Sequence, residues 1–184
     1  ILVKAIRRER ERTGQIFYVF NRIQGIDDAT FRIQALFPDM KIGVAHGGLS
    51  DAELERVMDD FYHKKIEMLV STAIIESGLD IPTANTIVIE NAHMFGLAQL
   101  YQLRGRVGRS DRRAFCFLLV PPGQRLSEEA RERLAVLTEH TGLGSGFLIA
   151  MRDLEIRGAG NILGTEQHGD IMAVGFDLYA RLLD

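Results

Sequence analysis

The sequence has few of the residues that mark secreted, disulfide-bonded or membrane-spanning proteins. Its 184 residues include one cysteine, and no apolar run approaches the roughly 20 residues of a membrane span. The opening "ILVKAIRRERER" turns charged after three residues, unlike a signal peptide. Cys116 lies in the apolar run "AFCFLLV", which predicts a core residue and no disulfide framework. We therefore expect a cytoplasmic protein in a reducing setting, without membrane contact.

Two chemical signatures are also missing. No glycine is followed by lysine, so the chain lacks the G-x-x-x-x-G-K-[ST] loop that cradles nucleotide phosphates. The five histidines are scattered and show no metal-ligand spacing with Cys116. Glu90 follows the apolar run "TIVI", but Asn91 comes next and no second acid is near, so an acidic magnesium box is disfavoured. We predict no metal site.

The charge of the chain is unevenly distributed. The formal net charge is -3, which argues weakly against a nucleic-acid-binding protein. Residues 101–120, however, hold five arginines against one aspartate, whereas residues 123–184 hold six arginines against ten acidic residues. A local basic patch therefore persists in an acidic protein.

Apolar, β-rich runs alternate with helix-periodic segments over the first two thirds of the chain. Ser50 and Glu53 form the S-x-x-E pattern of a capping box at the start of one such helix. Strands that are apolar on both faces and separated by helices predict an α/β fold, a parallel sheet covered by helices on both faces. The expected strands are 15–20, 41–46, 67–72, 86–90 and 114–120, and the expected helices lie near 24–36, 51–63 and 96–104.

The pattern changes after "VPPG" at 120–123. A helix is predicted over 127–140, with Ser127 as its cap, and a second over 147–158 after a glycine-rich break. We therefore divide the chain into an α/β domain, 1–122, and a C-terminal helical hairpin with its loop, 123–184. The chain begins without methionine and stops in the helix-periodic "DLYARLLD", so we expect a fragment of a longer protein.

The stretch "QLRGRVGRS" at 102–110 sets three arginines among two glycines where a helix should stop. A helix end that complements its dipole needs about one cation and one glycine. Arg106 and Arg109, three residues apart beside Gly105 and Gly108, can point the same way, and each guanidinium is a fork suited to phosphate oxygens. We therefore favour a phosphate-binding interpretation of this stretch.

Loops that leave the carboxyl ends of parallel strands are the usual ligand sites of such sheets. "AHGGL" at 45–49 alone reads best as a tight turn. "STAIIESGLDIP" at 71–82 offers hydroxyls, Gly78 and Asp80, and alone is balanced between a ligand loop and an ordinary Asx turn. Phosphate-facing arginines without a phosphate loop suit one half of a two-part motor, which supplies arginines across a cleft to a nucleotide held elsewhere.

These stretches resemble a known family. "QLRGRVGR" (102–109) resembles the sixth motif, Q-x-x-G-R-x-G-R, of superfamily 2 helicases and translocases. "VSTAIIESGLDIP" (70–82) resembles their fifth motif and "IFYVFN" (16–21) their fourth, in the same order and spacing. The resemblance implies a RecA-like second motor domain that acts with ATP and Mg²⁺, both held mainly by a first motor domain that these residues do not contain.

The rest of the chain narrows the resemblance. "DLEIRGAGNILGTEQHG" (153–169) is similar to the hairpin and loop that follow the second motor domain in RecG-type branch-migration helicases and in bacterial transcription-repair coupling factors. "FNRIQGIDD" (20–28) and "VGFDLYARLL" (174–183) are more similar to the coupling factors. This implies a double-stranded DNA translocase that displaces stalled RNA polymerase, with RNA polymerase and repair proteins bound by modules absent here.

The family resemblance also implies roles for single residues. Arg109 is the expected finger on the γ-phosphate, with Arg106 beside it and Gln102 facing the partner domain. Gly78 and Asp80 are expected at the ribose and phosphates. The expected contacts with the DNA backbone are Asn21, His46, Gly47 and Thr72, and the residues expected to couple hydrolysis to movement are Arg133, Arg157 and Gln167. A plainer reading of Arg157 pairs it with Glu155 or places it as a helix cap, and Gln167 is then a solvated loop residue.

Two other classes of function stay open. A nucleic-acid-binding module without motor activity would use the arginines for DNA affinity alone. A protein-docking domain would use the acidic hairpin and would depend on neither ATP nor DNA, although docking has no use for the glycine–arginine spacing. On the motor interpretation, the chain alone should bind nucleotide weakly and hydrolyse it negligibly.

Overall fold

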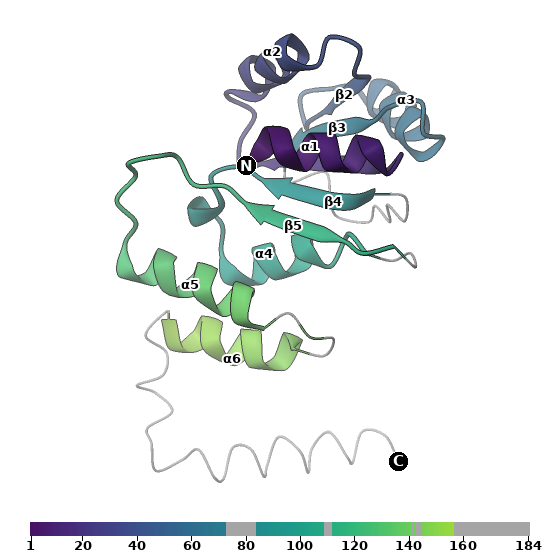
Figure 1. Cartoon of the computed structure of the whole chain (residues 1–184). Coiled ribbons are helices and arrows are strands. Elements are labelled where there is room, and N and C mark those ends of the chain that lie inside the picture. The colour runs from purple at the N-terminus through teal and green to yellow at the C-terminus, as the bar shows by residue number, and fades with distance from the viewer. Residues whose placement is uncertain (73–83, 109–111, 141, 143–144, 157–184) are drawn as a thin grey trace, which may run out of the picture.

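The computed structural model describes residues 1–72, 84–108, 112–140, 142 and 145–156. Five strands form one sheet in the order β2-β3-β1-β4-β5, and every neighbouring pair is parallel (Figure 1). The predicted α/β class and all five expected strands are therefore confirmed. The strands are β1 (Gln15–Phe20), β2 (Ile42–Ala45), β3 (Met68–Thr72), β4 (Ala84–Ile89) and β5 (Phe115–Leu118).

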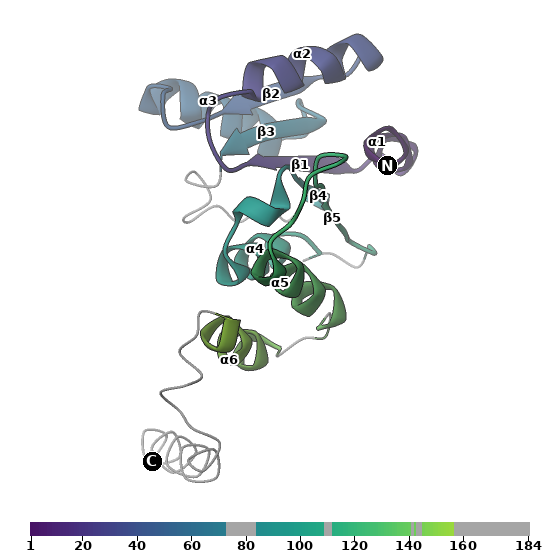
Figure 2. The ribbon, with the colours of Figure 1, turned by 90° about the vertical axis from the view of Figure 1, so that its left-hand side faces the viewer.

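Helices cover the sheet on both faces (Figures 1 and 2). Along β1, Phe17 and Val19 pack on the side of α3 and α4, whereas Ile16 and Tyr18 pack on the side of α1 and α2. This alternation follows from the two-residue period of a strand. No helix in the described ranges is long and apolar enough to cross a membrane. The helices are α1 (Leu2–Glu11), α2 (Ile26–Leu36), α3 (Asp51–Tyr62), the 3-10 turn η2 (Ala92–Met94), α4 (Leu97–Arg104), α5 (Glu128–Glu139) and α6 (Gly146–Ile156).

Helix α1 was not predicted from the sequence. Its buried residues Ala5, Ile6 and Glu9 follow helical spacing, but the third of them is an acid. Glu9 is only 1% exposed and accepts a hydrogen bond from Thr86 Oγ1 of β4 at 2.6 Å. Glu9 thus occupies a position in the buried stripe of α1 where the other members are apolar.

The C-terminal helices form the predicted hairpin as far as the described residues reach. Ser127 Oγ accepts a hydrogen bond from the Ala130 backbone at 3.2 Å, so the expected cap of α5 is confirmed. Val136, Leu137 and Ile149 join the same buried cluster as α4, and α6 lies outermost (Figure 2). The two helices thus extend the core of the α/β layer, and the boundary between 122 and 123 stays a prediction.

Cys116 is less buried than the sequence indicated. It is half-buried on the edge strand β5 and packs against the margin of the core cluster. Burial of the sulfur raises the pKa of the Cys116 thiol to about 12, so the group is neutral at physiological pH.

Candidate functional site

The residues predicted to bind ligands divide between opposite edges of the sheet. Asn21, His46 and Thr72 follow or end β1, β2 and β3, which places them at the carboxyl edge. Helix α4 connects the parallel strands β4 and β5, so it runs back from the carboxyl edge to the amino edge (Figure 1). Gln102 and Arg106 therefore lie at the amino edge. The rule that ligands meet loops at the carboxyl ends of strands therefore does not apply to these two residues, whose ligand contacts stay predictions.

The two glycines that end α4 differ in what they require. Gly105 has a right-handed backbone with φ of -69°, and its N–H bonds to the Tyr101 carbonyl at 3.0 Å. Gly108 has φ of +84°, and a Cβ added there would lie 2.9 Å from the Ala114 Cβ. Of these two positions, only 108 therefore requires a glycine, because of its backbone conformation and its close approach to Ala114.

One of the three arginines in this stretch, Arg104, has a structural role that needs no ligand. Arg104 Nη1 donates to the Leu137 carbonyl at 2.8 Å and to the His140 carbonyl at 2.7 Å. Its guanidinium also lies 5.1 Å from the centre of the Tyr101 ring. Arg104 thus binds two carbonyls at the carboxyl end of α5, where helical partners run out, and it fastens α4 to α5.

The remaining residues at the amino edge have the exposure that a ligand contact needs. Gln102 is exposed and Arg106 is half-buried directly after Gly105. The Arg106 N–H bonds to the Leu103 carbonyl at 3.0 Å, which continues the last turn of α4. The other predicted nucleotide contacts, Arg109, Gly78 and Asp80, lie outside the described residues, and their roles stay predictions.

Two arginines that sequence reasoning missed also lie at the amino edge. Arg12 Nη1 donates to the Arg113 carbonyl at 2.9 Å, and Arg112 Nη1 donates to the Arg12 carbonyl at 2.8 Å. The two segments are about a hundred residues apart in the sequence, and no local pattern relates them. The only sequence signal was the i,i+3 spacing of Glu9 and Arg12, which form an ion pair of 2.8 Å.

At the carboxyl edge, short-range hydrogen bonds shape the loop after β2. His46 Nδ1 accepts from the Gly48 N–H at 3.1 Å, and the His46 carbonyl accepts from the Leu49 N–H at 3.0 Å. Gly47 is exposed, with open space where a Cβ would stand. The predicted capping box of Ser50 and Glu53 is confirmed and begins α3 directly after this loop. The loop therefore presents backbone that a large ligand could approach.

The other two predicted DNA contacts differ in accessibility. Asn21 is half-buried at the end of β1. Thr72 is 1% exposed, and its hydroxyl has no hydrogen-bond partner among the described residues. Both stay predictions, and the burial of Thr72 works against a contact through its side chain.

Glu90, weighed above as a metal ligand, is engaged by a neighbour. The Tyr18 hydroxyl donates to Glu90 Oε2 at 2.6 Å. Burial and this hydrogen bond to a carboxylate both raise the pKa of the Tyr18 phenol well above its usual value. Among the described residues, no group of three or more His, Cys, Asp or Glu could hold a metal ion. For the whole chain, the absence of a metal site stays a prediction.

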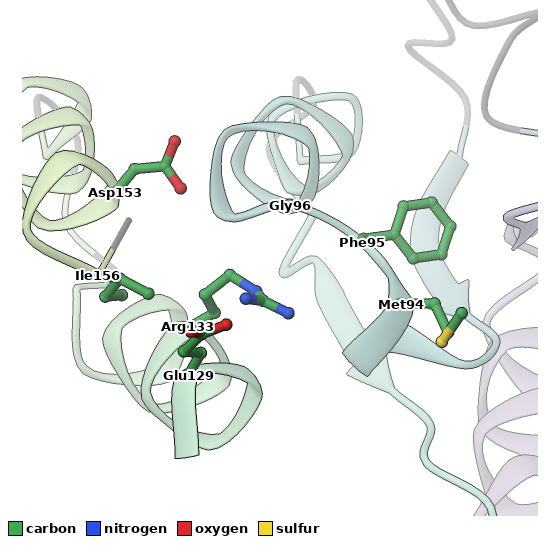
Figure 3. A pocket seen from close by; sticks show the side chains of 7 residues that line it. All are labelled: Met94, Phe95, Gly96, Glu129, Arg133, Asp153 and Ile156. Carbon is green, nitrogen blue, oxygen red and sulfur yellow. The ribbon is translucent and has the colours of Figure 1, made fainter. Parts of the chain in front are cut away.

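Arg133, a predicted coupling residue, lines a cavity between the hairpin and α4 (Figure 3). Its Nη2 donates to the His93 carbonyl at 3.2 Å, and its buried Nε has no partner among the described residues. The cavity, of about 450 Å³, is lined by Met94, Phe95, Gly96, Glu129, Arg133, Asp153 and Ile156. Arg133 thus connects α5 to the turn that precedes α4.

The other two predicted coupling residues, Arg157 and Gln167, lie outside the described residues. Glu155, the alternative partner weighed for Arg157, already binds Arg152 Nη1 at 2.7 Å. This contact between exposed side chains does not exclude a second one.

Comparison with known proteins agrees with this arrangement. Residues 1–111 match the helicase conserved C-terminal domain family. The chain is 52% identical, over 181 residues, to the transcription-repair-coupling factors of Staphylococcus epidermidis and Staphylococcus aureus strain USA300. Each alignment covers 98% of this chain and 16% of the relative, so the chain spans about a sixth of the length of those proteins.

Solved structures give the same fold. A structure of RecG bound to a three-way DNA junction matches with a TM-score of 0.72 and 41% identity, over 97% of this chain and 24% of that chain. The C-terminal domain of the DEAD-box protein Dbp5 matches with a TM-score of 0.56 and 18% identity, over 76% of this chain and 79% of that chain. The latter shows the fold alone. The predicted RecA-like architecture is confirmed.

Proposed function

This chain belongs to the helicase conserved C-terminal domain family, and on that premise we propose that it works as the second motor domain of an ATP-driven double-stranded DNA translocase. The observation that carries the proposal is the position of Arg106, on a turn held in place by Arg104 at the amino edge. Arg106 and Arg109 bind γ-phosphate oxygens of ATP, and Gly78 and Asp80 contact its ribose and phosphates. Mg²⁺ and the phosphate loop belong to the preceding motor domain, so this chain alone does not turn over ATP.

In this proposal Arg106 and Arg109 stabilise the negative charge of the transition state. Negative charge on the transferred phosphoryl group is distributed over its oxygens in the transition state, and a guanidinium fork can bind two of them. Such an arginine contributes roughly 10³–10⁵-fold to turnover in phosphoryl transfer. Gln102, exposed one turn before Arg106, faces the first motor domain across the cleft.

The carboxyl edge binds duplex DNA. Asn21, His46, Gly47 and Thr72 contact the phosphate backbone, which fixes the position of the DNA without reading its sequence. Support comes from the exposed backbone of Gly47 after β2 and the half-buried Asn21 after β1. DNA and nucleotide thereby meet different edges of one sheet, so each can be bound while the other is exchanged.

The helical hairpin couples hydrolysis to movement through Arg133, Arg157 and Gln167. Arg133 supports this assignment because it bonds to His93 in η2, and η2 leads directly into the α4 helix that carries Gln102. A shift of α4 on nucleotide binding is thereby transmitted to α5. Such a movement of packed helices is the shear type of domain transition.

The parent protein, in this proposal, acts in the cytoplasm in transcription-coupled DNA repair, where it displaces stalled RNA polymerase. The similarity to transcription-repair-coupling factors over nearly the whole chain supports this role. RNA polymerase and repair proteins bind to modules outside these residues. The structural likeness to RecG favours one alternative, a branch-migration helicase domain.

The test is DNA-stimulated ATP hydrolysis by this chain and by a longer chain that includes the preceding motor domain, each with and without Arg109→Ala. We expect no turnover from this chain, turnover from the longer one, and its loss with Arg109→Ala while DNA binding persists. A nucleic-acid-binding module without motor activity would instead lose DNA affinity with Arg109→Ala. Turnover by this chain alone would refute the half-motor proposal.

A further inference from the structure

The turn at 105–108 that carries Arg106 is held from two sides. On one side Arg104 fastens the end of α4 to the carbonyls of Leu137 and His140. On the other side Gly108 packs against Ala114, so closely that an added Cβ would lie 2.9 Å from the Ala114 Cβ. The position of the turn therefore depends on what fixes the chain next to Ala114.

The chain before Ala114 is fixed by α1. Arg12 Nη1 donates to the Arg113 carbonyl at 2.9 Å, and Arg112 Nη1 donates back to the Arg12 carbonyl at 2.8 Å. The Arg12 guanidinium also lies 5.1 Å from the centre of the Phe115 ring at the start of β5. These contacts join the end of α1 to the segment that begins β5.

Arg12 is itself oriented by a buried acid. Its Nη2 donates to both carboxylate oxygens of Glu9, at 3.0 and 2.8 Å, and Glu9 accepts a third hydrogen bond from Thr86 of β4. Glu9 needs the space beside Gly14, where any Cβ would overlap its carboxylate. A buried carboxylate costs free energy unless it is fully paired, so these three hydrogen bonds hold the Arg12 side chain in one orientation.

We propose that Arg12, oriented by Glu9, is a positioning residue for ATP hydrolysis, because it fixes Arg113 and Ala114 and through them the Arg106 turn. The inference rests on the proposed function and adds a residue that touches neither ATP nor DNA. A misplacement of about 1 Å can cost a reaction roughly 10²-fold in rate. Loss of the Arg12 contacts should therefore lower kcat more than it lowers the affinity for DNA.

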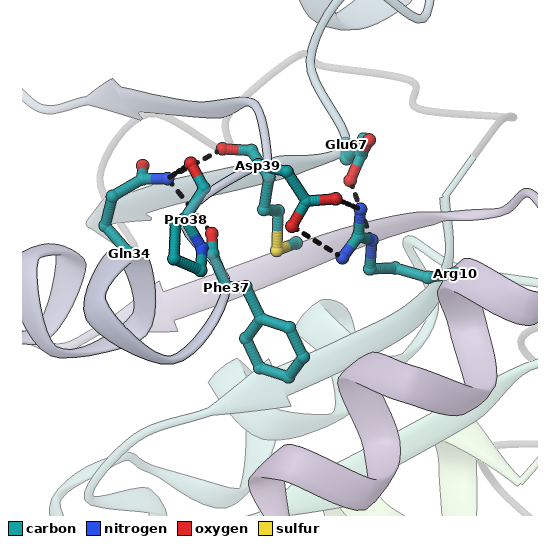
Figure 4. Close-up of polar contacts among 7 residues, drawn as sticks. Arg10, Gln34, Phe37, Pro38, Asp39 and Glu67 are labelled. Carbon is teal, nitrogen blue, oxygen red and sulfur yellow. Dashed lines mark hydrogen bonds and ion pairs between the residues drawn. The ribbon is translucent and has the colours of Figure 1, made fainter.

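The test uses the full-length parent protein with the pair Arg12→Met and Glu9→Gln, which removes the contacts without stranding a buried charge. Arg10→Met is the matched control, since Arg10 lies on the same helix and forms ion pairs with Asp39 at 2.6 Å and Glu67 at 3.1 Å, away from the turn (Figure 4). At saturating DNA and ATP we expect kcat to fall about tenfold or more with the Arg12 and Glu9 pair. Arg10→Met should leave kcat within about twofold, and neither variant should change the Kd for duplex DNA by more than that.

A second comparison distinguishes a positioning role of Arg12 from a purely structural one. If Arg12 acts through Arg106, the Arg12 and Glu9 pair should lower kcat less than about twofold further in an Arg106→Ala background, because coupled residues are not additive. Equal fold losses in the two backgrounds, or a kcat like that of Arg10→Met, would overturn the inference. Should the pair fail to fold, Arg112→Gln removes the exposed bond to the Arg12 carbonyl, and an unchanged kcat there would also overturn it.

The same measurements separate this inference from the proposed function. A normal kcat in Arg106→Ala and in Arg109→Ala would refute the proposed function, and this inference with it. A large loss with both of those variants, together with a normal kcat for the Arg12 and Glu9 pair, would refute the positioning role alone.

Discussion

The turn at 105–108 and the loop at 46–50 lie at opposite edges of one sheet and are held in different ways. Besides the helical bonds of Gly105 and Arg106, the turn depends on bonds between residues distant in sequence, with separations of 33 and 36 positions for Arg104 and about a hundred for Arg12 and Arg112. The loop depends on bonds that span two or three positions, from His46 to Gly48 and Leu49 and from Ser50 to Glu53.

The difference matches what each edge is proposed to bind. Phosphoryl transfer needs an arginine placed to within a fraction of an ångström, and long-range bonds tie such a residue to the whole fold. Contacts with the DNA backbone carry no sequence information and tolerate small shifts. A loop that folds locally is sufficient for them.

Arg106→Ala in the longer chain should have the largest effect. Removal of a guanidinium that stabilises transition-state charge is expected to lower kcat by roughly 10³-fold or more. Arg106→Lys should recover little, because an ammonium lacks the planar fork. The measurement is steady-state ATP hydrolysis at saturating duplex DNA. A fall in kcat of less than tenfold would show that Arg106 does not act at the nucleotide site.

Arg104→Met should destabilise the fold without a direct chemical effect. It removes two charge-assisted hydrogen bonds and leaves the His140 carbonyl with the 3.4 Å bond from Ser145 Oγ, which should cost about 2–3 kcal/mol. Urea denaturation of this chain measures the change. Arg152→Met, which removes the exposed ion pair with Glu155, is the control and should cost about 0.5 kcal/mol or less. Equal effects would mean that Arg104 does not fasten α4 to α5.

Gly108→Ala should destabilise the chain, whereas Gly105→Ala should not. A side chain at φ of +84° costs about 1–2 kcal/mol, and contact with Ala114 adds to it. Gly105 is right-handed, so alanine there should be neutral or stabilising by up to about 1 kcal/mol. Urea midpoints of the two variants test this directly. The reverse order would contradict the described shape of the turn.

Ser50→Ala should have the smallest effect, because the carboxyl-edge loop is held locally. Loss of the α3 cap should cost about 1 kcal/mol in urea denaturation. Ser50→Thr, which keeps a hydroxyl that can accept from the Glu53 N–H and donate to the Glu53 carboxylate, is the control and should retain most of the stability. A cost above about 3 kcal/mol for alanine would show that the loop depends on more than its local bonds.

This contrast also explains what the sequence could predict. The apolar runs of β1 and β4 and the Ser50 capping box are signals contained within a few residues, and the structure confirms them. The arginine motif at 102–109 is also a signal contained within a few residues, so Arg106 could be singled out from the sequence. Helix α1 was not predicted, and the burial of Glu9 in it could not be, because its partner Thr86 lies in a distant strand.

Long-range roles could not be predicted from spacing. Arg104 stood in the same motif as Arg106, and only the folded position of α5 shows that it binds the carbonyls of that helix. Arg12 and Arg112 look like solvated cations in the sequence, and their reciprocal bonds exist only because α1 lies beside the start of β5. The edge to which each site belongs follows from the direction of the strands, because α4 leads from the carboxyl end of β4 to the amino end of the parallel strand β5.

The most direct test of the two-edge account measures kcat for ATP at saturating DNA and Kd for duplex DNA on the same two variants of the longer chain, Arg106→Ala and Asn21→Ala. The account predicts that Arg106→Ala lowers kcat by roughly 10³-fold with Kd within about twofold. It predicts that Asn21→Ala raises Kd several-fold with kcat at saturating DNA within about twofold. Comparable changes of both quantities in both variants would contradict the separation of nucleotide and DNA between the two edges.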